Sequence, residues 1–232
     1  MRMRSASKVG SACAIAGVGL LFVGTYLHPM EADPNDPAAA FAEYAADHAW
    51  VASHLMQLAG VASMVVALLL LAEQLKSRKG SSVARIGAAG AVVSLALAAA
   101  LQAVDGIALK AMVEAWAAAP ALQKEGVFHA AFAVRQLEIG LASMFCLSMG
   151  FTATVFGVAL LEDGAFPKWC GGLGIVGGLS TGVAGVVIAY TGFSGLAMAI
   201  NMPANFLLLL WMLVLGGFMW HRGGAVLEQF QV

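Results

Sequence analysis

Residues 52–71 read ASHLMQLAGVASMVVALLLL, a run with no Asp, Glu, Lys or Arg. A helix needs about 20 mostly apolar residues to cross a bilayer, because free backbone groups find no water there. Similar stretches recur along the chain, and the predicted spans are residues 9–27, 52–71, 86–104, 139–161, 171–190 and 203–220. We therefore expect an all-α membrane protein with six transmembrane helices, forming a single helical-bundle domain over residues 1–232.

The composition supports a membrane protein. The chain is 61% hydrophobic and 11% charged, and its mean hydropathy is +0.86. Soluble domains have about 45–50% apolar and about 25% charged residues. The net charge of −1 leaves no basic surplus to neutralise phosphates, and three cysteines cannot form a disulfide framework. These values exclude a soluble enzyme, a nucleic-acid binder and a disordered protein.

The charged residues predict the orientation. Positively charged residues favour the cytoplasmic side of a membrane protein. With a cytoplasmic N-terminus, nine of the 12 Lys and Arg residues fall inside: Arg2, Arg4, Lys8, Lys76, Arg78, Lys79, Arg85, Lys168 and Arg222. Most acidic residues fall on the other side. We therefore expect both termini in the cytoplasm. The Ala- and Gly-rich composition further indicates a bacterial inner membrane.

The second, third and fourth helices are expected to overrun the membrane. Their predicted ranges are residues 36–76, 82–119 and 121–163, each continuous and about 55–63 Å long at 1.5 Å per residue. An acidic cap followed by Pro begins the first of them. Pro120 and Gly164 end the other two. Because the hydrocarbon core is only about 30 Å thick, these helices should form an extracytoplasmic helical cap.

One polar layer is expected where these helices leave the membrane. Counting about 17–23 residues outward from their inner ends reaches the same height on all three. The layer contains His54, Gln57, Gln102, Asp105, Arg135 and Glu138, and His28, Tyr190, Asn201 and Asn205 lie at the outer ends of other spans. Ionisable groups at this depth usually face the bundle interior. They predict an outward-facing polar pocket, or alternatively a structural ion-pair network that ties the helices together.

The pocket hypothesis gives the first functional expectation. It is an integral membrane protein that binds a small ligand, a lipid or a partner subunit. In it, His54 acts as a proton acceptor or ligand, and Arg135 receives an anionic group.

A second polar layer is expected about 8–14 Å further out, in the cap. It contains His48, Lys110, Glu114 and His129. Two histidines and a carboxylate can form an open metal site, so His48, Glu114 and His129 are candidate ligands for a divalent metal. No two of them share a helical face in an HxxxH pattern, and a solvated surface is the alternative explanation.

Two other functions stay open. The first is a membrane-embedded oxidoreductase that uses haem or a metal. Haem would need histidines at matching depth, such as His54 with His28 or His48 with His129. The second is a small transporter, although no inverted repeat is detectable. The sequence contains no CxxC or nucleotide-binding motif.

The fifth span carries glycines at every fourth position, Gly174, Gly178 and Gly182. Small residues at this spacing let helix backbones approach closely in lipid. The partner of this face is either another helix of the chain or a second subunit, as in a homo-oligomer or a membrane complex.

Three short stretches carry a family resemblance. Asp36–Ala39 reads DPAA after the first span, Val104–Lys110 reads VDGIALK, and Val134–Gly140 reads VRQLEIG. Together with the long Ala-rich helices, they resemble a family of six-span bacterial membrane proteins known only as a domain of unknown function. The resemblance implies a membrane bundle and assigns no activity to any residue.

Overall fold

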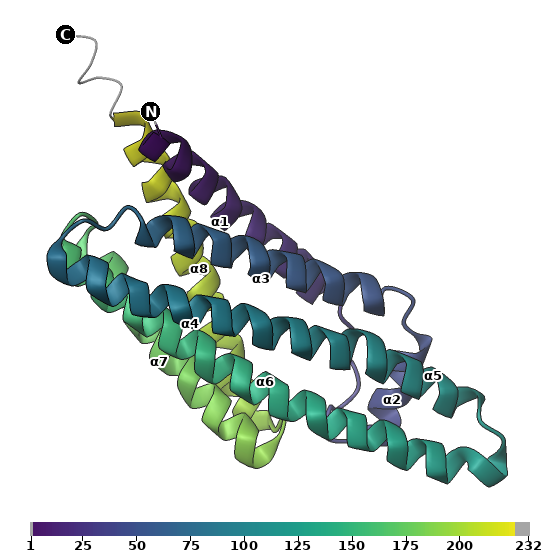
Figure 1. Cartoon of the computed structure of the whole chain (residues 1–232). Helices are drawn as coiled ribbons and strands as arrows, with labels where there is room; N and C mark the ends of the chain where they lie inside the picture. The colour runs from purple at the N-terminus through teal and green to yellow at the C-terminus, as the bar shows by residue number, and fades with distance from the viewer. Residues whose placement is uncertain (1, 226–232) are drawn as a thin grey trace.

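The computed structural model describes residues 2–225, which form helices joined by short loops and contain no strand (Figure 1). The α-helices are α1 (Arg2–Tyr26), α2 (Pro37–Ala46), α3 (Trp50–Ala72), α4 (Arg78–Gln102), α5 (Lys110–Ala118), α6 (Ala121–Asp163), α7 (Lys168–Thr191) and α8 (Gly195–Ala225). A π-helical segment, η1 (Ala103–Leu109), joins α4 to α5 without a break.

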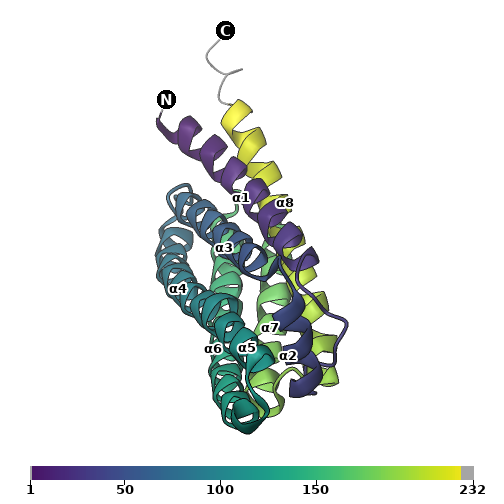
Figure 2. The ribbon, with the colours of Figure 1, turned by 90° about the vertical axis from the view of Figure 1, so that its right-hand side faces the viewer.

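Within residues 2–225, six helical stretches are long and apolar enough to cross a membrane, as predicted. The helices that contain them, α1, α3, α4, α6, α7 and α8, each pack against the next, and α8 returns to α1. Figure 2 shows this ring, with α1 beginning and α8 ending at the same end of the bundle. The protein is therefore a polytopic all-α membrane protein.

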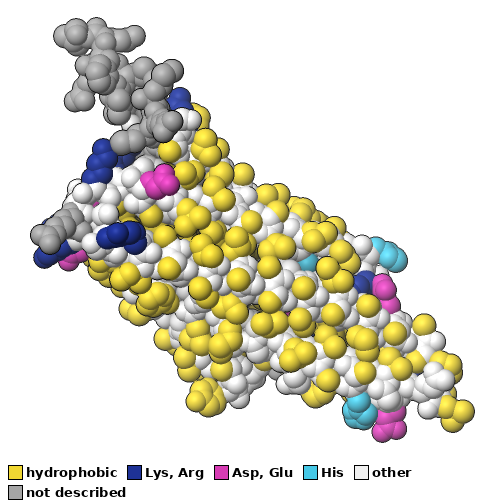
Figure 3. All heavy atoms as spheres, viewed as in Figure 1, with side chains coloured by type: hydrophobic (Ala, Val, Ile, Leu, Met, Phe, Trp, Pro, Cys, Tyr) yellow, Lys and Arg dark blue, Asp and Glu magenta, His cyan; other side chains and the backbone are white. Residues whose placement is uncertain are grey.

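The outer surface of the bundle is apolar. Large exposed hydrophobic side chains occur on all six long helices, among them Phe22, Leu55, Val92, Phe151, Leu179 and Phe206. Figure 3 shows these side chains covering the middle of the molecule, while most Lys and Arg side chains in that view gather at the end where α3 joins α4. This distribution is the one expected of a surface that faces lipid between two polar boundaries.

A helical cap extends beyond the bundle at the opposite end. It consists of α2, α5 and the first part of α6, a helix of 43 residues that measures about 65 Å at 1.5 Å per residue. The cap has its own buried core, formed by Ala40, Phe41, Tyr44, Trp50, Leu109, Val113 and Ala131. The predicted extension of the middle helices into a cap is therefore confirmed.

The second helix is not continuous, contrary to the prediction for residues 36–76. Asp47 takes an extended conformation and ends α2, and its carboxylate accepts a hydrogen bond from the Ala49 amide at 2.8 Å before α3 begins. The buried ammonium of Lys110 donates to the carbonyl oxygens of Tyr44, Ala45 and Asp47 at 2.8–3.0 Å. Lys110 therefore satisfies carbonyl groups that the end of α2 leaves without helical partners.

The third helix also departs from its predicted form. It begins at Arg78 rather than near Ser82, because Ser77 is the N-cap and its hydroxyl accepts from the Gly80 amide at 3.0 Å. Within it, η1 replaces a regular α-helical stretch between Ala103 and Leu109. A π-helical segment rotates the residues that follow it and is frequent at functional sites.

The boundaries of α6 agree with the prediction. It runs from Ala121 to Asp163, and Gly164 ends it in the left-handed conformation with φ 71°. The last helix, α8, begins at Gly195, so Pro203 lies inside it rather than at its start.

Candidate functional site

The polar side chains of the predicted layer meet where the bundle joins the cap. His54 comes from the second turn of α3, Asp105 from η1, and Arg135 and Glu138 from α6. His54, Arg135 and Glu138 are 1%, 5% and 3% exposed. The guanidinium of Arg135 lies 5.0 Å from the ring centre of Phe193, in the turn between α7 and α8. The cluster thus lies at the level where α7 ends and α8 begins.

The ring of His54 has a hydrogen-bond acceptor at both nitrogens. Nδ1 donates to the Trp50 carbonyl at 2.7 Å, since a carbonyl oxygen can only accept. Nε2 lies 3.0 Å from Oδ2 of Asp105. If both groups were in their usual neutral-pH forms, a lone pair on Nε2 would face a carboxylate. A proton or another cation must therefore lie between Nε2 and Asp105.

His28 joins the cluster from the loop between α1 and α2. Its Nδ1 donates to the Pro29 carbonyl at 2.8 Å, and its ring centre lies 5.1 Å from that of His54 and 4.7 Å from that of Trp50. One ring nitrogen of each histidine and a carboxylate oxygen of Asp105 lie within 4.8 Å of one another. Burial lowers the pKa of His28, although the nearby Asp105 opposes this shift. The ring of His28 is therefore neutral at pH 7.

Arg135 is already paired. Its Nη1 donates to both carboxylate oxygens of Glu138, at 2.9 and 2.7 Å. The guanidinium also lies over the rings of Tyr44 and Phe193, at 5.4 and 5.0 Å from their centres. Burial raises the pKa of Tyr44 to about 12, so its hydroxyl stays neutral. The predicted role of Arg135 as an anion receptor therefore competes with a carboxylate that is in place.

The charges of the cluster balance only if His54 and Asp105 hold a proton or another cation between them. Arg135 offsets Glu138, and the carboxylate of Asp105 has only His54 as a partner. Oδ1 of Asp105 is buried and has no hydrogen-bond partner among the described residues. Buried acceptors without a partner are rare in folded proteins and require an explanation, such as a bound ion or ligand. An unpartnered carboxylate oxygen is an acceptor that a positively charged group would satisfy.

Gln57 and Gln102 lie one helical turn deeper. The Gln102 amide donates to the side-chain oxygen of Gln57 at 3.2 Å, which links α4 to α3. The side-chain oxygen of Gln102 is also buried without a partner among the described residues. All six side chains of the predicted layer are thus found near one another, as three contacting pairs.

The π-helical segment positions Asp105. The indole Nε1 of Trp50 donates to the backbone carbonyl of Asp105 at 3.0 Å. A Cβ atom on Gly106 would lie 2.6 Å from Cβ of His54, so only glycine allows this approach of η1 to α3. Trp50 was not predicted as part of the site. Its spacing from His54 is the signal for it, because residues four apart lie on one face of α3.

The second predicted layer does not assemble a metal site. His48 is exposed in the break between α2 and α3, and Glu114 pairs with Lys110 at 3.1 Å. His129 projects from α6, where its side chain is 69% exposed beside Glu125. These three residues do not form a group with metal-ligand spacing. Among the described residues, the group with metal-ligand spacing is instead His28, His54 and Asp105.

The geometry does not fit haem. The ring centres of His28, Trp50 and His54 are 4.6–5.1 Å apart, so the three rings pack directly on one another. A haem with two axial histidines would need a flat slot between those rings. The contacts between the rings leave no such slot between His28 and His54.

The glycines of α7 pack within the chain. A Cβ on Gly178 would lie 2.6 Å from the Gly150 carbonyl of α6, and one on Gly174 would lie 2.9 Å from the Trp211 ring of α8. Both positions therefore contact other helices of the same chain, which was one of the two partners predicted for this face. Gly182 also lies against α6, where a Cβ on Gly150 would meet its backbone nitrogen at 2.6 Å.

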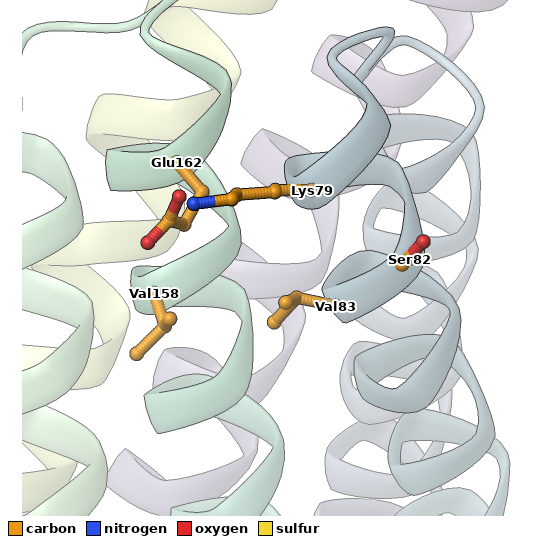
Figure 4. Close-up of a pocket in the computed structure, with 5 residues that line it drawn as sticks. All are labelled: Lys79, Ser82, Val83, Val158 and Glu162. Atoms are coloured by element: carbon orange, nitrogen blue, oxygen red, sulfur yellow. The ribbon is translucent and has the colours of Figure 1, made fainter.

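A shallow groove lies at the other end of the bundle, between α4 and α6. Its lining consists of Lys79, Ser82, Val83, Val158 and Glu162, and the side chain of Lys79 extends toward Glu162 (Figure 4). Glu162 is 24 residues beyond Glu138 on α6, which corresponds to about 36 Å. The groove is therefore separate from the polar cluster.

Comparison with known proteins places the chain in a family. Residues 9–216 match the family described as a domain of unknown function (DUF4386). The chain belongs to this family. The matched range includes every residue of the polar cluster, from His28 to Glu138. No curated protein and no solved structure shows significant similarity to the chain.

Proposed function

We propose that this protein binds a small, positively charged ligand in the polar cluster between the bundle and the cap. The residues of this site are His54, Gln57, Gln102, Asp105, Arg135 and Glu138, with His28 beside them. The observation that carries the proposal is Oδ1 of Asp105, a buried carboxylate oxygen without a partner. Because Arg135 is bound by Glu138, the remaining charge favours a cation over the anionic group that the sequence suggested.

The proposal includes an orientation in the cell membrane. Lys8, Lys76, Lys79, Arg85, Lys168 and Arg222 lie near the end where α3 joins α4. By the preference of positive residues for the cytoplasm, that end and both termini face inward. The polar cluster then lies at the outer boundary of the membrane, which we take to be a bacterial inner membrane. Transporter sites usually lie near the midplane, so this depth favours binding over transport.

Ligand screening by thermal stability tests the proposal. The purified protein in detergent is heated with monovalent and divalent cations, small organic amines, small organic anions or lipids. A ligand at 100 times its Kd should stabilise the folded state by about 2.7 kcal/mol. We expect this stabilisation from cationic compounds, and we expect Asp105→Asn to abolish it.

Glu125→Gln is the matched control, because Glu125 is an acid of α6 whose side chain is 90% exposed. It should respond to each ligand as the unmodified protein does. The proposal is wrong if no cation stabilises the unmodified protein more than Asp105→Asn, or if only anions do.

A further inference from the structure

We propose that His28, His54 and Asp105 bind a divalent transition-metal ion, with Zn²⁺ as the probe. This inference rests on the proposed function, because it names the cation that the site takes. The three residues come from the α1–α2 loop, α3 and η1, so the ion would link segments that are far apart in the sequence.

Both histidines have the hydrogen-bonding pattern of metal ligands. Nδ1 of His54 donates to the Trp50 carbonyl at 2.7 Å, and Nδ1 of His28 donates to the Pro29 carbonyl at 2.8 Å. Metal-binding histidines usually donate their other N–H to a carbonyl or carboxylate, which fixes the tautomer and orients the ring. In both residues this arrangement leaves the lone pair on Nε2.

The distances suit coordination of one ion. Two ligand atoms that bind the same Zn²⁺ at about 2.0–2.1 Å lie about 3.0–3.4 Å apart. Nε2 of His54 and Oδ2 of Asp105 are 3.0 Å apart, and the ligand atoms of all three residues lie within 4.8 Å. Closing the rest of this gap requires His28 to move by about 1–2 Å, which its position in a loop allows.

The charge of the site also favours a cation held by nitrogen. A divalent ion would replace the proton that Nε2 of His54 and Asp105 otherwise share, and it would accept electron density from the buried oxygens of Asp105. Two imidazoles and one carboxylate suit Zn²⁺, Fe²⁺ or Co²⁺, whereas Mg²⁺ and Ca²⁺ prefer oxygen ligands. Three protein ligands leave at least one position on the ion for water or a further ligand.

Metal titration tests the inference. The protein is purified without a polyhistidine tag, freed of metal with a chelator, and titrated with Zn²⁺ against a chromophoric competitor. We expect one ion per chain. Loss of an outer partner of a metal ligand lowers affinity by about 10–100-fold, so His54→Gln, Asp105→Asn or His28→Gln should lower it by at least about 100-fold.

Surface histidines provide the matched controls. His48→Gln and His129→Gln remove exposed imidazoles outside the cluster and should leave the affinity unchanged. His28→Gln guards against a misfolded variant, because His28 lies in a loop rather than in a packed helix. Co²⁺ gives a second measurement, since its visible absorption reports nitrogen ligation and should be lost in the same three variants.

The outcomes separate the inference from the proposed function. The inference is overturned if Zn²⁺ binds the unmodified protein no more tightly than it binds Asp105→Asn and His28→Gln. If an organic cation still stabilises the protein in that case, the proposed function stands without the metal. If no cation of any kind binds, both proposals are wrong.

Discussion

Glu138 and Arg135 form a buried pair in which each residue depends on the other. Both side chains are less than 10% exposed, and their closest atoms are 2.7 Å apart. Removing one partner of a buried ion pair usually costs about 3–5 kcal/mol, because the other charge is left without compensation. We therefore expect Glu138→Gln to lower the free energy of unfolding by about this amount, measured by denaturant titration in detergent micelles.

The double variant Arg135→Met/Glu138→Leu is the control for this prediction. Replacing both charges by apolar side chains of similar size is often neutral or stabilising, so it should recover most of the loss. If Glu138→Gln unfolds at the same denaturant concentration as the unmodified protein, the pair does not stabilise the fold. Retained cation binding in the stable double variant would show that the cation does not need Arg135 and Glu138.

The π-helical segment η1 sets the distance between α3 and the continuous helix formed by α4, η1 and α5. Gly106→Ala would place a Cβ 2.6 Å from Cβ of His54, so one of the two helices must shift. Overpacking of this kind costs about 1–3 kcal/mol. We expect Gly106→Ala to lose that stability and, because the shift separates His54 from Asp105, to lose cation binding as well. Thermal unfolding with and without Zn²⁺ measures both effects.

Gly140→Ala separates this steric effect from the general effect of adding a methyl group to a helical glycine. Gly140 lies in α6, and a Cβ there would meet nothing within 4 Å. Replacing an unconstrained helical Gly by Ala stabilises a helix by about 0.5–1 kcal/mol. Equal behaviour of the two variants would show that η1 does not depend on the close approach at Gly106.

The helices were predictable from the sequence where one strong signal decided them. The length of the apolar runs predicted six spans, and Pro120 and Gly164 predicted both ends of α6. The break before α3 was not predictable, because the sequence around it is rich in Ala, which favours helix. It depends on the distant Lys110, whose ammonium binds the carbonyl oxygens at the end of α2.

The site was predictable only in part, because its geometry also depends on residues that are distant in the sequence. Counting residues along helices placed His54, Asp105 and Glu138 at one height, since the rise per residue is constant. The i, i+3 spacing of Arg135 and Glu138 also places these two side chains on one face of α6. Residue counting could not show that Asp105 turns toward His54, which depends on packing against Trp50 and η1. The position of a loop residue such as His28 follows from no helical periodicity.

The whole molecule has charges of different kinds at its two ends. One end has the basic residues of the α3–α4 and α6–α7 connections, and the other has the cap with acids such as Glu31, Asp33 and Asp36. Between them lies a closed ring of six apolar helices. Because basic residues of membrane proteins favour the cytoplasmic side, this charge distribution predicts that the cap lies outside the cell.

Cysteine labelling in intact bacterial cells tests this orientation. In a background with Cys13, Cys146 and Cys170 replaced by Ala, His48→Cys should react with a membrane-impermeant maleimide before permeabilisation. Lys79→Cys and Lys168→Cys should react only afterwards; all three introduced positions are exposed on the protein surface. The opposite pattern would place the polar cluster on the cytoplasmic side of the membrane. The site would then have to obtain its cation inside the cell.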